Sequence, residues 1–213
     1  MYKHGKNLKI IDPQSTFISD DAVIGDNVTI YERNRIDGGC VIGDGCTLLP
    51  GNYLKDTRIG KDTVFNSSQA EGAEVGDGVT VGPYARLRPG AMIGDRARIG
   101  NFVEIKNAKI GEETKVSHLA YVGDAEVGRR CNIGCGAIFV NYNGKSKNRA
   151  TVGDNCFIGS NSNIIAPVNI AGNTYITAGA TVTEDLCDGD FVIGRARQTV
   201  KSGRAYEYLK ERF

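Results

Sequence analysis

The sequence predicts an all-β fold, a parallel β-helix built of hexapeptide repeats with a short C-terminal tail. Three observations support this prediction. A large apolar residue recurs at nearly every sixth position over most of the 213 residues. Gly, Asn and Asp recur between these positions, where tight turns need residues that tolerate unusual backbone angles. Neither a helical period nor simple alternation fits the pattern, whereas a fixed hexapeptide period is typical of a β-helix.

The apolar residues form one track along the chain. It runs through Ile18 to Leu54, Ile59 and Phe65, Val75 to Ile105, Ile110 to Val122, Val127 to Phe139, and Val152 to Val182. Each hexapeptide is interpreted as one short strand and one corner, with the track residue pointing inward. Three hexapeptides close one triangular coil, and coils stack about 4.8 Å apart because one coil cannot bury its own apolar side.

The length suits a single domain. We expect residues 1–190 to form the β-helix, with residues 1–13 as a polar N-terminal arm. Residues 66–74 interrupt the period and are expected to form a side loop. Residues 140–151 are expected to project as a second loop, because the step between track residues there is too long for one coil. The period fades in residues 191–213, where we expect a tail ending in a short helix.

Composition excludes several classes of protein. The net charge of +1, from 26 basic and 25 acidic residues, argues against nucleic acid as a partner. No apolar run approaches the roughly 18 residues of a membrane helix. The N-terminus has no apolar core like that of a signal peptide, so a cytoplasmic protein is expected.

Four of the six cysteines follow the repeat. Cys40, Cys46, Cys131 and Cys156 each lie two residues before a track residue, a position that elsewhere holds Ala or Val. A free cysteine behaves as a small buried apolar residue, so packing explains these four better than disulfides do. The chain has no paired Cys-x-x-Cys spacing, which argues against zinc. Cys135 lies outside the pattern, as does Cys187.

Two cations are predicted to stack at one corner of the coil. Arg88 and Lys106 each directly follow a track residue of the third strand in their coils, and Tyr121 lies near the same corner one coil later. Solvated surface cations would explain this equally well. Arg and Lys together also suit a phosphate group, so an anion site is the alternative interpretation.

A second alignment places one histidine at the head of a row of small residues. The residues two positions after the second-strand track form a ladder of His118, Cys135, Ser160 and Ala178. If the period holds, Arg195 and Arg197 lie near the next rung. Such a row leaves a groove roughly 14 Å long, suited to a slender cofactor arm. A subunit interface would also favour small side chains, but we favour a functional role for His118.

Several motifs resemble a known family. They are VGPYARLRPG at 81–90, GNFVEIK at 100–106, SHLAYVGDAE at 117–126 and NYNG at 141–144, with Ala166-Pro-Val and Gln198-Thr. The chain from about residue 75 to 203 resembles the acetyltransferase domain of the bacterial bifunctional glucosamine-1-phosphate acetyltransferase/N-acetylglucosamine-1-phosphate uridylyltransferase. Residues 14–70 resemble it only as hexapeptide coils. The resemblance implies a left-handed β-helix.

The resemblance also implies an activity and its residues. The enzyme would transfer acetyl from acetyl-CoA to the amine of glucosamine 1-phosphate, for UDP-N-acetylglucosamine and cell-wall (peptidoglycan) precursor synthesis, with His118 as general base and no metal. Sugar-phosphate contacts would come from Arg88, Lys106, Tyr121, Asn132 and Lys147. Acetyl-CoA contacts would come from Cys135, Asn141, Tyr142, Ser160, Ala178 and Arg195. Cys135 replaces the alanine usual in the family.

The family is trimeric, so we expect a homotrimer with sites between subunits. Nothing in the sequence resembles the family's Gly-rich uridylyltransferase half. We therefore expect a stand-alone acetyltransferase or one working with a separate uridylyltransferase chain. A backbone N–H between Asn132 and Gly136 is expected to stabilise the oxyanion.

Three other classes of protein are alternatives to this interpretation. A γ-type carbonic anhydrase needs three histidines on zinc, and the chain has only His4 and His118. A non-catalytic solenoid subunit of a nucleotidyltransferase has no need for His118, Arg88 and Lys106 at their positions. An N-acyltransferase acting on another amino sugar remains open, because a fold does not determine its substrate.

Overall fold

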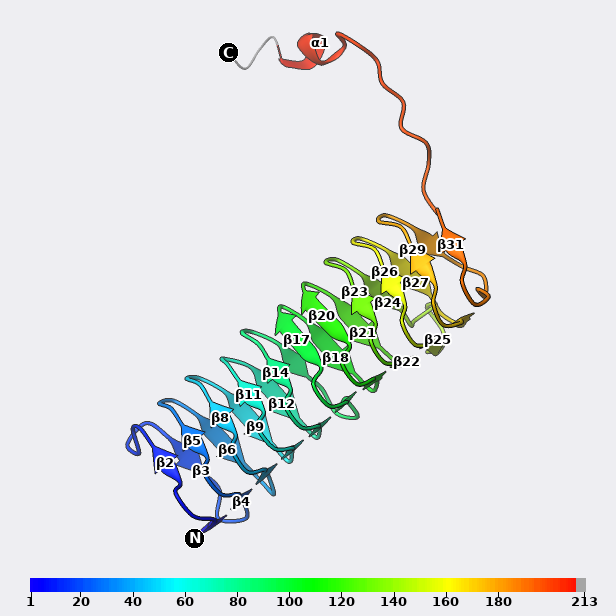
Figure 1. The fold of residues 1–213 in the computed structure, drawn as a ribbon. Coiled ribbons are helices and arrows are strands. Elements are labelled where there is room, and N and C mark those ends of the chain that lie inside the picture. The colour runs from blue at the N-terminus through cyan, green and yellow to red at the C-terminus, as the bar shows by residue number, and fades with distance from the viewer. Residues whose placement is uncertain (210–213) are drawn as a thin grey trace.

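The computed structural model describes residues 1–209 and shows one continuous stack of triangular coils (Figure 1). Three parallel sheets form the sides of the stack, and from β1 to β30 the chain visits them in turn, so that every third strand returns to the same sheet. The all-β prediction and the parallel β-helix of hexapeptide repeats are confirmed.

The strands are mostly two or three residues long. The first sheet contains β1 (Lys3–His4), β4 (Val23–Ile24), β7 (Val41–Ile42), β10 (Arg58–Ile59), β13 (Glu74–Val75), β16 (Met92–Ile93), β19 (Lys109–Ile110), β22 (Ala125–Val127), β25 (Ala150–Val152) and β28 (Val168–Ile170). The second contains β2 (Lys9–Ile10), β5 (Thr29–Ile30), β8 (Thr47–Leu48), β11 (Val64–Phe65), β14 (Thr80–Val81), β17 (Arg98–Asn101), β20 (Lys115–His118), β23 (Asn132–Ile133), β26 (Phe157–Ile158), β29 (Tyr175–Ile176) and β31 (Phe191–Val192). The third contains β3 (Phe17–Ile18), β6 (Arg35–Asp37), β9 (Tyr53–Lys55), β12 (Gln69–Glu71), β15 (Arg86–Leu87), β18 (Glu104–Lys106), β21 (Tyr121–Gly123), β24 (Ile138–Val140), β27 (Asn163–Ile165) and β30 (Thr181–Val182).

The predicted track forms the core. Track residues of successive coils face one another in the parallel ladders, as Leu87 and Ile105 do between β15 and β18. From Ile24 to Val182 the track residues are buried, and only Ile18, in the first coils, is half-buried. Each sheet thus turns one row of apolar side chains inward and leaves the alternate row, which includes the site residues, facing outward.

The expected N-terminal arm and one expected loop are part of the coils instead. Residues 1–13 are not a separate arm, because β1 and β2 pair with β4 and β5 and build the first coil. Residues 66–74 are not a side loop, because β12 pairs with β9 and β15. Ala70 is buried at the track position there, and its small side chain was not recognised as a member of the apolar track.

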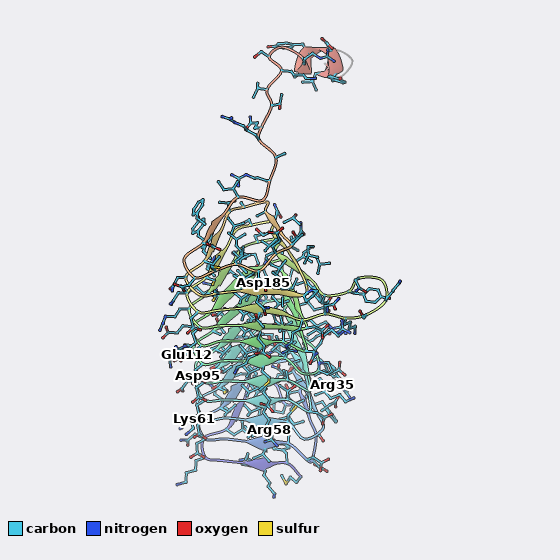
Figure 2. The ribbon with its side chains drawn as sticks, turned by 90° about the vertical axis from the view of Figure 1, so that its right-hand side faces the viewer. Arg35, Arg58, Lys61, Asp95, Glu112 and Asp185 are labelled. Carbon is cyan, nitrogen blue, oxygen red and sulfur yellow. The ribbon has the colours of Figure 1, made fainter. Side chains whose placement is uncertain are left out.

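The segment between β24 and β25 projects from the stack as a loop, residues 141–149 (Figure 2). The coil also extends further than expected at its C-terminal end, because β31 still pairs with β29. Beyond β31 the chain leaves the stack, and the last described element is helix α1 (Ala205–Leu209), which buries no residue (Figure 1). Within residues 1–209 no helix is long and apolar enough to cross a membrane.

All six cysteines are free. Cys40, Cys46, Cys131 and Cys156 are buried in the core, as the repeat predicts, and Cys135 and Cys187 are exposed.

Candidate functional site

The predicted site residues lie mainly along two corners of the coil that border the third sheet. The B–C corner, as we name it, joins second-sheet strands to third-sheet strands, and His118 lies there at the end of β20. The C–A corner joins third-sheet strands to first-sheet strands. Lys106 lies there at the end of β18, and the 141–149 loop leaves the coil at the same corner.

The small-residue ladder exists as predicted on the B–C corner. Backbone hydrogen bonds connect the coils at this corner: the Asn161 N–H donates to the Cys135 carbonyl, the Gly179 N–H to the Ser160 carbonyl, and the Gly136 N–H to the carbonyl of Leu119, the residue after His118, each at 2.8 Å. His118, Cys135, Ser160 and Ala178 therefore occupy successive rungs, and all four are exposed. Between His118 and Ala178 the ladder carries only the small side chains of Cys135 and Ser160, so no large side chain of the ladder fills this surface.

Arg195 ends this ladder. Its guanidinium donates to the Thr177 hydroxyl at 2.7 Å and to the Ala178 carbonyl oxygen at 3.2 Å. The side chain is exposed, so a positive charge stands at the opposite end of the ladder from His118. The prediction that Arg195 lies near the last rung is confirmed.

His118 makes one side-chain contact at the head of the ladder. Its Nδ1 atom lies 2.7 Å from Oδ1 of Asn101, a residue at the end of the neighbouring strand β17. The contact leaves the other ring nitrogen, Nε2, available to a ligand.

A cluster of cations lies at the C–A corner. Arg88 and Lys106 occupy adjacent rungs, since the Arg88 N–H donates to the Ile105 carbonyl at 2.8 Å. The Arg88 guanidinium also donates to Glu104 at 2.8 Å, and this carboxylate raises the pKa of Arg88. Lys147, from the loop, comes close enough to Lys106 for that like-charged neighbour to lower the pKa of Lys147. Like-charge repulsion at this corner therefore acts between Lys106 and Lys147.

Asp124 compensates part of this positive charge. Its side chain is only 7 % exposed, and it accepts hydrogen bonds from Asn107 at 2.6 Å and from Asn141. Burial disfavours the charged form, but these hydrogen bonds and the charges of Lys106 and Lys147 outweigh it and hold the pKa of Asp124 below its usual range. Asp124 is thus a buried carboxylate that ties the loop to the coil.

The loop carries three of the predicted site residues. Asn141 is bound to Asp124, and its amide also lies 3.4 Å from the hydroxyl of Tyr121. Tyr142 is exposed, and its hydroxyl donates to the Gly144 carbonyl at 2.8 Å. Tyr121 stretches along β21 over Gly123, where a Cβ atom would collide with the tyrosine hydroxyl. Because Gly123 has no side chain, the Tyr121 side chain can lie over it, between the two corners.

Asn132 is not brought to either corner. It lies on β23, on the outer face of the second sheet, opposite Lys115 of β20 and Phe157 of β26. It lines a hollow of about 390 Å³ with charged neighbours that include Arg96, Glu113 and Arg130. Within a single chain, Asn132 therefore stands apart from the cations with which it was grouped.

Sequence reasoning missed three residues that contact the predicted ones, Asn101, Glu104 and Asp124, and a fourth, Asn107, that contacts Asp124. Each lies about one coil from its partner, so the same spacing that aligned Arg88 with Lys106 could have found them. Their side chains are neutral or acidic, so they do not fit the pattern of an anion site.

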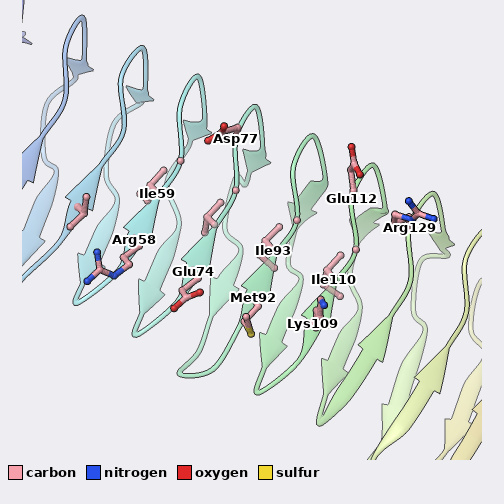
Figure 3. Close-up of a pocket in the computed structure, with 16 residues that line it drawn as sticks. Arg58, Ile59, Glu74, Asp77, Met92, Ile93, Lys109, Ile110, Glu112 and Arg129 are labelled. Atoms are coloured by element: carbon pink, nitrogen blue, oxygen red, sulfur yellow. The ribbon is translucent and has the colours of Figure 1, made fainter.

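Two grooves lie away from these corners. A groove of about 670 Å³ runs along the first sheet, between a row with Arg58, Glu74, Met92 and Lys109 and a corner row with Asp77, Glu112 and Arg129 (Figure 3). A second groove continues past Arg129 to Leu186. Among the residues described, none of the predicted site residues lines either groove. No cluster of three metal-binding side chains occurs within residues 1–209 either.

Comparison with known proteins places the repeats in a family. Residues 21–56 and 72–107 match the bacterial transferase hexapeptide family (six repeats), and residues 149–184 match the hexapeptide repeat of succinyl-transferase. Among solved structures, the Arabidopsis UDP-N-acetylglucosamine acyltransferase is similar in fold, with a TM-score of 0.60 at 19 % identity over 84 % of this chain and 69 % of that chain. The Bacteroides fragilis 9343 protein LpxA has a TM-score of 0.54 at 19 % identity, over 83 % of this chain and 68 % of its own.

Sequence relatives are much more similar. The bifunctional protein GlmU of Clostridium novyi (strain NT) is 46 % identical over 211 residues, which is 98 % of this chain and 46 % of the relative. That of Halalkalibacterium halodurans is 49 % identical over 92 % of this chain and 43 % of the relative. The chain therefore spans somewhat less than half the length of these relatives. It belongs to the bacterial hexapeptide-repeat transferases and is similar, along almost its whole length, to one part of the bifunctional GlmU proteins.

Proposed function

We propose that the chain is an N-acetyltransferase that moves an acetyl group from acetyl-CoA to the amine of glucosamine 1-phosphate, a step toward UDP-N-acetylglucosamine. The observation that carries the proposal is the ladder on the B–C corner. It places an exposed imidazole at one end of a row of small residues and the Arg195 guanidinium at the other. The similarity to bifunctional GlmU proteins supports the same activity.

The donor fits this ladder by shape and charge. The pantetheine arm of acetyl-CoA is narrow and uncharged, so it suits the surface over Cys135, Ser160 and Ala178. Its phosphate-bearing end suits Arg195, and its thioester then lies near His118. Cys135 replaces the family's alanine, and its exposed thiol is compatible with a contact made through the backbone.

The acceptor fits the outer face of the third sheet. Lys106 and Lys147 supply the positive charge that a sugar phosphate requires, and Arg88 lies one rung away. Tyr121 lies on this face between the lysines and His118. A phosphate held by the lysines would leave the amine of the same sugar on the face toward His118.

The chemistry requires a base at His118. An amine near neutral pH is largely protonated and must lose a proton before it attacks a thioester carbon, and an unperturbed histidine titrates near 6.5. The C–N bond forms as His118 takes the amine proton, then the C–S bond breaks and the proton passes to the departing thiolate of CoA. The backbone N–H groups of Asn132, Gly134 and Gly136 already donate within the coil. We therefore assign the oxyanion contact to the N–H of Cys135.

We further propose that the enzyme works as a homotrimer. Asn132 lies on the outer face of the second sheet, away from the cations at the C–A corner of its own chain. A neighbouring copy that packs its second sheet near this corner would supply Asn132 to the sugar phosphate.

A thiol-release assay with acetyl-CoA tests the activity. Glucosamine 1-phosphate should be acetylated faster than glucosamine, glucosamine 6-phosphate or other amino sugars. Lys106→Ala should raise the KM for glucosamine 1-phosphate more than the KM for acetyl-CoA. A preference for another amino sugar would replace the proposed acceptor, and no thiol release with any acceptor would refute the enzymatic function.

A further inference from the structure

The contact between Asn101 and His118 depends on an unusual local feature of the second sheet. β17 and β20 are each four residues long, whereas the flanking strands β14 and β23 have two. The extra length brings Asn101 directly opposite His118 in the parallel register. The ladder then continues into the corner, where the Leu119 N–H donates to the Asn101 carbonyl at 2.9 Å.

Gly100 makes this extension possible. A Cβ atom at Gly100 would collide with the carbonyl oxygen of Ser117 on the next strand. Any larger residue would push β17 away from β20 at the point where Asn101 meets His118. The local backbone therefore holds the two side chains opposite one another and fixes their separation.

The hydrogen bond determines which ring nitrogen carries the proton. An amide oxygen can only accept, so the 2.7 Å contact to Asn101 Oδ1 requires the proton on Nδ1 of neutral His118. We propose that Asn101 is the positioning residue of His118: it holds the imidazole in the Nδ1–H tautomer and aims the free Nε2 lone pair at the substrate amine. The kinetic part of this inference rests on the proposed function, whereas the tautomer does not.

The tautomer can be measured directly, because the chain has only two histidines. ¹⁵N spectra of histidine-labelled protein, assigned with His118→Gln, distinguish the two neutral tautomers. We expect the Nδ1–H form at His118 in the unmodified protein and a shift to the Nε2–H form in Asn101→Ala. His4, whose Nδ1 contacts the Gly5 carbonyl at 3.0 Å, is the internal control and should not change.

The kinetic arm separates positioning from folding. Asn101→Ala should lower kcat about tenfold to a hundredfold with little change in either KM, because a misaligned base acts in the transition state. Asn169→Ala, a strand asparagine that faces outward from the first sheet and bonds to Thr151, is the matched control and should retain full activity.

Asn101→Asp supplies a third readout. A carboxylate at this position favours the imidazolium and should move the acid limb of the kcat/KM profile upward by roughly one pH unit. The other titratable side chains on the strands and corner packed against His118 are Arg98, Glu104, Lys115, Tyr121 and the Cys135 thiol, and none of them changes in this variant.

An Nε2–H tautomer in the unmodified protein, or an unchanged tautomer in Asn101→Ala, would overturn the proposal. If Asn101→Asp lowers the melting temperature but does not shift the pH profile of kcat/KM, then Asn101 has a purely structural role. If the unmodified protein acetylates no amino sugar, the proposed function is wrong. The tautomer measurement then still tests whether Asn101 holds His118 in the Nδ1–H form.

Discussion

Replacing Asp124 with glycine should release the 141–149 loop from the coil. The Asp124 carboxylate accepts hydrogen bonds from Asn107 on the coil and from Asn141 at the start of the loop. Glycine removes both bonds but tolerates the left-handed backbone that Asp124 adopts, with φ of 47°. The change therefore tests the side-chain contacts without adding backbone strain.

Asn107→Gly is a matched control. Asn107 occupies the same corner one coil earlier, with φ of 44°. Its replacement removes the hydrogen bond between Asn107 and Asp124 but leaves the one between Asp124 and Asn141. The difference between the two variants thus isolates the contact between Asp124 and the loop. A hydrogen bond to a charged group contributes about 1.5 to 3 kcal/mol, which corresponds to roughly a tenfold to hundredfold change in the loop-opening equilibrium.

Hydrogen exchange at the base of the loop measures this difference. The Asn148 N–H donates to the Asn141 carbonyl at 2.7 Å, and the Ala150 N–H donates to the Asp124 carbonyl at 3.3 Å. Both amides should exchange roughly tenfold to a hundredfold faster in Asp124→Gly than in Asn107→Gly. The KM values for both substrates should also rise in Asp124→Gly, because Asn141, Tyr142 and Lys147 all belong to the loop. Equal exchange in the two folded variants would refute the role of Asp124.

The pH dependence of hydrogen exchange in the loop tests the same contact between Asp124 and the loop. The pKa of Asp124 lies below its usual range in the folded protein, so its contribution is present above the ordinary value near 3.9 and is lost as the pH falls through the folded pKa. Loop protection should therefore weaken below about pH 4 in the unmodified protein. In Asp124→Gly this acid-dependent loss should be absent.

Three further predictions concern the catalytic groups and the assembly. His118→Ala should lower kcat by about 10²- to 10⁴-fold without unfolding the coil, because the side chain is exposed; near-normal turnover in a folded variant would mean that another group is the base. Ala178→Leu should raise the KM for acetyl-CoA more than that for glucosamine 1-phosphate and leave the melting temperature nearly unchanged, since Ala178 is exposed; unchanged acetyl-CoA kinetics would show that the ladder does not bind the donor. Light scattering should give three times the chain mass of 22.9 kDa, and a monomer at micromolar concentration would contradict sites shared between copies.

The hexapeptide period was sufficient to predict most of the fold. Because every coil repeats the same strand and corner, residue spacing alone aligned Leu87 with Ile105 and placed His118 at the head of the ladder. The prediction was wrong where a coil lacks large aliphatic residues at its track positions. Ala70 and the first strands β1 and β2 pair normally, but their small or polar residues carry too weak an apolar signal to be recognised.

The sequence by itself determined which residues share a corner, because that depends only on the repeat. The tertiary structure decided which of their side chains meet. The Asp124 carboxylate joins Asn107 to Asn141, each 17 residues away, but spacing alone does not show that these three side chains turn toward one another. Asn101 meets His118 because Gly100 lets two backbones approach, a steric condition that only the neighbouring coil reveals.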